Sequence, residues 1–133
     1  MVLNFRNRWE RRVRDYCDSQ YELIAVTSGD INFYYKCHLI STHYAINEGH
    51  EKLALIVSRD KKNLLPVVHF VNYDGEKFID NSLGCWSRDQ EYRFIRWVGK
   101  DEFWDTPTIL TDTKKFFSNM ASVFVKKFWN ISN

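Results

Sequence analysis

The stretch Leu65–Gly84 constrains the fold most, because it predicts a β-hairpin with a histidine in one strand and an aspartate in the other. Two runs rich in β-forming residues, 67–73 and 77–81, flank the dipeptide Asp74-Gly75. Asp-Gly between such runs is a strong hairpin signal, because both turn residues tolerate positive φ. The sequence therefore predicts an antiparallel hairpin that turns at this dipeptide.

The length of the turn decides which residue faces the histidine. A two-residue loop at Asp74-Gly75, or a four-residue loop centred on it, predicts that His69 lies directly opposite Asp80, whereas a three-residue loop puts Ile79 there. Directly opposed residues share a face with Cβ atoms about 5 Å apart, within hydrogen-bonding reach of an imidazole and a carboxylate. A His whose Nδ1–H is held by an Asp is oriented and made more basic, as a general base requires.

Strand alternation makes both faces of this hairpin apolar. The residues divide into Val67, His69, Val71, Phe78 and Asp80 on one face and Val68, Phe70 and Ile79 on the other. We therefore expect the hairpin to be covered on both sides. A carboxylate on a covered face is costly unless it is hydrogen-bonded or paired, so His69 is the expected partner of Asp80.

The rest of the chain predicts helices before and after a mostly antiparallel sheet. Helical apolar spacing occurs at 4–16, at 37–48, which ends before Gly49, and after a predicted N-cap at Asp112. Apolar runs predict strands at 53–58 and 92–98, while 21–27 fits a short strand or the tail of the first helix. The stretch 99–108, which contains Pro107, is expected to be irregular, with a turn of helix at 101–104 as the alternative for that part. No linker or repeat divides the chain, so we expect one α+β domain over residues 1–133.

Cys37 is the candidate nucleophile, because it stands at the N-terminal end of a predicted helix that is apolar on several sides. The helix dipole and the free N–H groups at such an end favour a thiolate, and a neighbouring imidazolium favours it further. The same N–H groups can donate to the oxyanion of a tetrahedral intermediate. With His69 and Asp80 downstream, the sequence predicts a Cys-His-Asp triad.

The order of Cys37, His69 and Asp80 on helix, strand and adjacent strand resembles the transglutaminase-like branch of the papain-like cysteine proteinase superfamily. The resemblance covers Asp30–Gly84 and is carried by the text Val-His-Phe-Val-Asn-Tyr-Asp-Gly-Glu-Lys-Phe-Ile-Asp-Asn-Ser-Leu-Gly. It implies a central Cys-bearing helix packed on an antiparallel sheet, here flanked by N- and C-terminal helices. It also implies chemistry at an amide or ester carbonyl, with Cys37 as nucleophile, His69 as base and then acid, and Asp80 as the orienting group.

Other residues are candidates for supporting roles. The amides of Asn32 and Gln20 are candidate oxyanion donors, although spacing fixes neither. Tyr34, Tyr35 and Trp86 are candidates for a substrate groove, and packing around the helix start is the alternative for the two tyrosines. Cys85 is a rival nucleophile because Gly-Cys-Trp resembles a papain nucleophile, but no histidine follows His69, so the order disfavours it.

Charge and composition disfavour several other classes of protein. The net charge is +2, from 19 basic and 17 acidic residues, which does not favour nucleic acid as the main partner. No apolar run approaches a membrane span, and the charged N-terminus does not resemble a signal peptide, so a cytoplasmic protein without a membrane partner is expected. His38, His43 and His50 are not spaced as metal ligands on one helix face, and we expect no metal and no cofactor.

The sequence therefore predicts a cysteine-dependent hydrolase or acyltransferase that acts on an amide bond in a peptide, an isopeptide or a glutamine side chain. A protein or peptide substrate is the expected partner, and the oligomeric state stays open. The alternative is a non-catalytic binding or inhibitor module on the same scaffold, such as a phage or bacterial accessory protein, with Trp86, Trp97 and Trp104 exposed. A weaker alternative is nucleic-acid binding through the arginines of the first helix, which fit a solvated face better.

Overall fold

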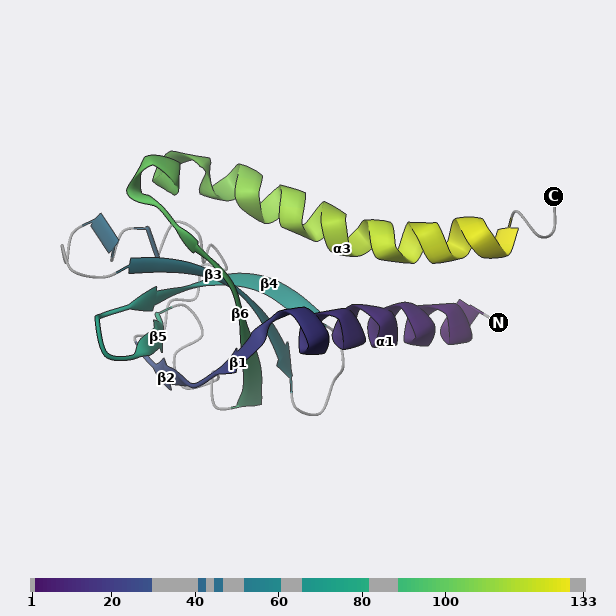
Figure 1. Ribbon diagram of the computed structural model, residues 1–133, viewed down its shortest axis with the longest axis horizontal. Helices are drawn as coiled ribbons and strands as arrows, with labels where there is room; N and C mark the ends of the chain where they lie inside the picture. The colour runs from purple at the N-terminus through teal and green to yellow at the C-terminus, as the bar shows by residue number, and fades with distance from the viewer. Residues whose placement is uncertain are drawn as a thin grey trace.

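The computed structural model describes residues 2–29, 41–42, 45–46, 52–60, 66–81 and 89–129, with side chains from residue 10 to residue 120 apart from that of Asp60. These residues form a mixed α+β fold, in which a six-stranded sheet packs against two long helices (Figure 1). The elements are α1 (Val2–Gln20), β1 (Glu22–Ile24), β2 (Val26–Ser28), β3 (Lys52–Asp60), β4 (Pro66–Tyr73), β5 (Phe78–Asp80), β6 (Gln90–Val98), the 3₁₀-helix η2 (Lys100–Asp105) and α3 (Thr106–Trp129).

The sheet is curled, and its two edges are formed by consecutive parts of one bent segment, residues 22–28. The strand order is β1-β6-β3-β4-β5-β2. At one edge β1 pairs antiparallel with β6, and at the other β2 pairs parallel with β5. Because only Ala25 separates β1 from β2, residues 22–28 supply both end strands of this order and pair with β6 and with β5. This closure gives the sheet an inner face as well as an outer one.

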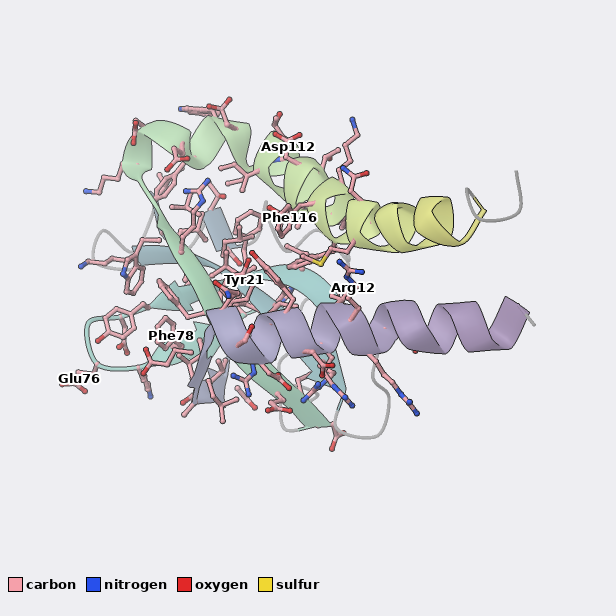
Figure 2. The ribbon with its side chains drawn as sticks, turned by 45° about the vertical axis from the view of Figure 1, so that its right-hand side comes forward. Arg12, Tyr21, Glu76, Phe78, Asp112 and Phe116 are labelled. Carbon is pink, nitrogen blue, oxygen red and sulfur yellow. The ribbon has the colours of Figure 1, made fainter. Side chains whose placement is uncertain are left out.

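The outer face of the sheet packs against α1 and α3, which run side by side and extend past the sheet at the end where both chain termini lie (Figure 1). The core on this side is contributed by both helices and by the sheet, and its buried members include Val13, Cys17, Leu55, Phe70 and Phe117. An aromatic contact joins the helices, with the rings of Tyr16 and Phe116 centred 5.5 Å apart. In Figure 2, Phe116 extends from α3 toward α1 and Tyr21.

The inner face of the sheet has a smaller core of its own. Ala54, Ile56, Val71 and Tyr92 are buried there, and Ile24, Val26, Phe78 and Phe94 pack against them. Val68 and Phe70 belong to the helix-side core, whereas Val71 and Phe78 belong to this inner core. The predicted alternation of the hairpin, with two apolar faces, is therefore confirmed.

The hairpin turn has one of the predicted lengths but is displaced along the chain. Tyr73 pairs with Phe78, so residues 74–77 form a four-residue loop that begins at Asp74 instead of being centred on Asp74-Gly75. The Asp74 carboxylate accepts hydrogen bonds from the N–H groups of Glu76 and Lys77, both at 2.9 Å, and Gly75 has φ of 104°. The backbone bonds, first that from Lys77, hold the pKa of Asp74 below its usual range. The turn is thus closed by the Asp74 side chain together with a backbone bond from the Asp74 N–H to the Lys77 carbonyl over 3.2 Å.

Two expectations for the C-terminal part of the chain are wrong. Asp112 is not an N-cap, because α3 already begins at Thr106, and 99–108 as a whole is not irregular, because η2 leads directly into that helix. The alternative of a helical turn at 101–104 is confirmed, since these residues lie in η2. Pro107 lies in the first turn of α3, where its missing N–H costs nothing. Glu102 accepts bonds from the Gly99 N–H and from the Arg96 guanidinium, which fixes the entry to η2.

The N-terminal and central predictions are met in part. The first helix is longer than the predicted 4–16, and 21–27 forms two short strands instead of a helix tail. Of the predicted helix 37–48, the structure describes residues 41–42 and 45–46, and these are helical. The remainder of that segment, including Cys37, lies outside the described residues.

Candidate active site

β4 and β5 bring His69 and Asp80 into contact on the inner face of the sheet. His69 Nε2 lies 3.0 Å from Asp80 Oδ2. Asp80 is fully buried and His69 is 6% exposed. Because water does not reach the carboxylate, its hydrogen bonds must come from the protein. The predicted contact of these two side chains is therefore present.

The predicted register of this pair is wrong by two residues. Asn72 pairs with Ile79 and Tyr73 with Phe78, so continuing the ladder puts Asp80 opposite Val71 and not opposite His69. Because the register is shifted by an even number of residues, every side chain still lies on its predicted face. His69 and Asp80 consequently meet as diagonal neighbours on one face.

The nitrogen that Asp80 holds also differs from the expectation. We expected the Nδ1–H of His69 to bond the carboxylate, but Nε2 makes this contact. The orienting effect is the same, since either nitrogen can donate while the other accepts. If His69 acts as a general base, Nδ1 is therefore the nitrogen that accepts the proton.

Tyr92 completes the polar group at the inner face. Its hydroxyl, on β6, donates to the same Asp80 Oδ2 over 2.6 Å, and the residue is 2% exposed. An oxygen that receives two donors is suited to an ionised carboxylate, which only accepts. Together His69, Asp80 and Tyr92 form a buried triplet in which the carboxylate is fixed from two sides.

The sequence pattern did not identify Tyr92, although one signal was present. A fully buried carboxylate needs more than one donor, and a tyrosine at the start of the predicted strand 92–98 is a suitable source. The sequence pattern does not predict that the sheet curls, and the curl is what brings Tyr92 to Asp80. β3 and β4 separate β6 from β5 in the strand order, so the contact of Tyr92 with Asp80 crosses the inner face.

The backbone of Asp80 is fixed by the segment that closes the sheet. Ser28 of β2 pairs with Asp80, and the Gly29 N–H donates to the Asp80 carbonyl over 3.0 Å. A Cβ at Gly29 would collide with Asn81 Oδ1 and would lie 2.7 Å from Ile79 Cγ2. Glycine suits this position because a Cβ would crowd these two side chains and would lie 3.0 Å from the Asp80 carbonyl oxygen.

Replacing Gly29 with alanine should lower the free energy of unfolding by about 1–3 kcal/mol, the usual cost of overpacking a close contact. The added methyl group has to push β5 and Asn81 away from β2. Urea unfolding followed by circular dichroism measures the effect. Gly75→Ala is a useful comparison because a Cβ there meets no atom within 4 Å, so its cost comes only from the positive φ. Equal stability of Gly29→Ala and the wild type would contradict this account of the closure.

The remaining predicted site residues are not brought to this triplet by the described structure. Cys37, Asn32, Tyr34, Tyr35, Cys85 and Trp86 lie outside the described residues. Gln20 is exposed at the end of α1, a helix whose buried side chains pack against the outer face of the sheet. Of the predicted site residues, the structure thus describes His69, Asp80 and Gln20, and it brings His69 and Asp80 together.

Comparison with protein-family models, curated proteins and solved structures finds no match to this chain. Among the residues described, no helix combines the length and apolarity needed to cross a bilayer. Within the same ranges, no three His, Cys, Asp or Glu side chains gather as metal ligands do.

A cavity on the helix side is distinct from the triplet. It has a volume of about 20 Å³ and is lined by Arg14, Cys17, Asp18, Val57, Arg59, Pro66, Glu91 and Arg93. Ion pairs hold its walls, with Arg59 2.6 Å from Glu91 and Arg93 3.0 Å from Asp18. Burial, followed by the charge of Asp18, raises the pKa of Cys17 to about 11. This thiol stays protonated near neutral pH and belongs to the core.

Proposed function

We propose that the protein is a cysteine-dependent hydrolase or acyltransferase that acts on an amide bond through Cys37, His69 and Asp80. The observation that carries the proposal is the buried contact between His69 and Asp80, reinforced by Tyr92. A fold needs no buried carboxylate at this place, since apolar residues of similar volume would fill it at no greater cost. A histidine oriented by a buried carboxylate is the arrangement that general base catalysis uses.

Chain connectivity supports Cys37 as the nucleophile. Ser41 is fully buried, and its hydroxyl donates to the carbonyl of Phe70 over 3.1 Å. Phe70 is the residue after His69, and Cys37 precedes Ser41 by four residues. Four residues span at most about 14 Å, which limits how far Cys37 can lie from Ser41. Cys17, in contrast, is buried on α1, and burial raises the pKa of its thiol to about 11.

In the proposed reaction, His69 Nδ1 takes the proton of the Cys37 thiol, and the thiolate attacks the carbonyl carbon of the amide. The tetrahedral intermediate collapses as the carbon–nitrogen bond breaks, and the imidazolium returns the proton to the leaving amine. Water or a second amine, deprotonated by His69, then attacks the thioester and releases Cys37. Asp80 orients the imidazole and stabilises the imidazolium in each half-reaction.

The finer parts of the proposal rest on the sequence. The order of nucleophile, base and orienting acid supports a transglutaminase-like arrangement of the papain-like type, with the Cys-bearing helix packed on the sheet. Asn32 is the proposed oxyanion donor, and Tyr34, Tyr35 and Trp86 are proposed to line the groove for a protein or peptide substrate. Gln20 is a weaker oxyanion candidate, because α1 packs on the outer face of the sheet.

Alkylation by iodoacetamide at pH 7, followed by peptide mass spectrometry, tests the proposed nucleophile. Cys37 should react at least about tenfold faster than Cys17, because an activated thiol is partly ionised at this pH and Cys17 is not. Cys85 should react like an ordinary thiol. Cys37→Ala should abolish release of amine from a peptide or glutamine substrate, while Cys17→Ala should retain it. Similar alkylation rates for all three cysteines would contradict the proposal.

A specific surface favours a binding module as the second candidate function. The rings of Tyr73, Phe78, Phe94 and Trp97 contact one another at one end of the sheet, with centroids 4.9 to 6.1 Å apart. Trp97 is 42% exposed, and Trp104 on η2 is 85% exposed. Exposed tryptophans of this kind are frequent in binding surfaces. A partner whose binding is lost in Trp97→Ala and unchanged in Cys37→Ala would favour this candidate.

A further inference from the structure

A chain of buried hydrogen bonds links the helical segment at Ser41 to the end of β5. The Asn72 side-chain amide donates to the Ser41 carbonyl over 2.8 Å, and its oxygen accepts from Asn81 Nδ2 over 3.0 Å. Ser41 and Asn72 are fully buried and Asn81 is 4% exposed. Each of these bonds thus joins two groups that solvent does not reach. If one partner were removed, bulk water could not take its place.

These bonds lie next to the candidate active site, on the other side of the sheet. Asn81 directly follows Asp80, and Asn72 is three residues after His69 on β4. Alternation places Asn72 on the helix side with Phe70, while His69 and Asp80 occupy the inner face. The strands that hold His69 and Asp80 therefore also hold, on their opposite face, the anchor of the segment that follows Cys37.

The side chain at position 72 is suited to this linking role. Asn72 lies opposite Leu53 of β3, and the neighbouring helix-side positions of the sheet are apolar. An aliphatic side chain would therefore fill this buried position equally well if packing were its only role. An amide can donate to a carbonyl and accept from a second amide at the same time, which an aliphatic side chain cannot do. The second bond at this anchor, from the Ser41 hydroxyl to the Phe70 carbonyl, fixes the same turn of helix.

We infer that Asn72 is a positioning residue, which fixes residues 41–42 and 45–46 on β4 and thereby sets the place of Cys37 relative to His69. The part that concerns Cys37 rests on the proposed function, whereas the fixing of these residues does not. Asn72 touches neither the substrate nor the reacting atoms. It acts through the backbone carbonyl of Ser41, which is four residues from Cys37 in the sequence.

Amide hydrogen exchange measured by NMR tests the fixing of the segment. In Asn72→Ala, exchange at residues 41–42 and 45–46 should quicken by at least about tenfold relative to the amides of β3, because the segment loses its side-chain anchor. Asn81→Ala removes the other bond of the Asn72 amide and keeps the one to Ser41, so its effect on these residues should be smaller. Thr106→Val, which removes a buried hydroxyl at the start of α3, controls for loss of a buried hydrogen bond elsewhere.

Alkylation of Cys37 in the same variants tests the positioning. Asn72→Ala should slow it about 10–100-fold at a temperature where the protein is folded, with the rate unchanged in Thr106→Val. If Asn72→Ala does not fold, Asn72→Asp, which keeps the acceptor for Asn81, replaces it. Exchange at residues 41–42 and 45–46 that rises no more than in β3 would overturn the inference. So would faster exchange in a variant whose Cys37 is alkylated as fast as an activated Cys37 in the wild type. Faster exchange with a Cys37 that is slow even in the wild type would uphold the anchor and count against the proposed function.

Discussion

Replacing Asp80 with alanine is expected to lower the free energy of unfolding by about 2–5 kcal/mol. The change leaves His69 Nε2 and the Tyr92 hydroxyl without their common acceptor, and each buried donor without a partner costs about 1–3 kcal/mol. Asp80→Asn keeps the volume and one acceptor oxygen, so its loss should be smaller. Urea titrations of the three proteins, followed by tryptophan fluorescence, give the free energies.

Tyr92→Phe is the matched control for Asp80→Ala, because it removes one of the two donors and leaves the contact of Asp80 with His69. Its cost should be about 1.5–3 kcal/mol, the range for a hydrogen bond to a charged group. Asp80→Ala should cost at least as much as Tyr92→Phe. An Asp80→Ala protein within about 0.5 kcal/mol of the wild type, the scatter of ordinary surface changes, would show that the buried triplet does not stabilise the fold.

His69→Gln is expected to reduce catalysis by about 10²–10⁴-fold, the usual contribution of a positioned general acid–base group. The glutamine amide can still donate to Asp80, so the fold should be retained, but it cannot accept the Cys37 proton near neutral pH. The ratio kcat/KM for amine release from a peptide or glutamine substrate measures the loss. Alkylation of Cys37 at pH 7 should slow in the same variant, because the thiol loses its base.

The pH profile of Cys37 alkylation separates a chemical role of His69 from a structural one. In the wild type the rate should rise at a lower pH than in His69→Gln, because an imidazolium next to a thiolate favours the ionised pair. Thr106→Val should have the profile of the wild type, since its buried hydroxyl lies at the start of α3. Identical profiles for the wild type and His69→Gln would rule out His69 as the partner of Cys37.

The hairpin shows which features the sequence can predict. Period-two alternation assigned His69 and Asp80 to one face, and that assignment survived an error in register because the error was even. The register itself depends on where the loop begins, and here the loop begins at Asp74, whose carboxylate accepts two backbone bonds. Residue types alone do not say whether an aspartate in Asp-Gly will lie in the middle of its turn or at the start of it.

The closure of the sheet is the feature that the sequence could not predict. β1 and β2 have three residues each, too few for alternation to be recognised, and β2 pairs in parallel with a strand about fifty residues later in the chain. The donor from Tyr92 depends on that closure, so it was missed with it. The start of α3 was missed for a local reason, because a proline such as Pro107 occurs both in irregular chain and in the first turn of a helix.

The segment 22–28 also sets the order in which the protein can be assembled. Its partners are β5 and β6, so Glu22 can pair with Phe94 only after more than seventy further residues have been synthesised. Long-range pairings of this kind form slowly, because the entropy of the intervening chain is lost before any contact is gained. A nascent chain that ends just after β5 contains both strands of the His69–Asp80 hairpin. It still lacks β6, which carries Tyr92 and pairs with β1. The buried triplet is therefore a late product of folding, completed only after β6 has been made.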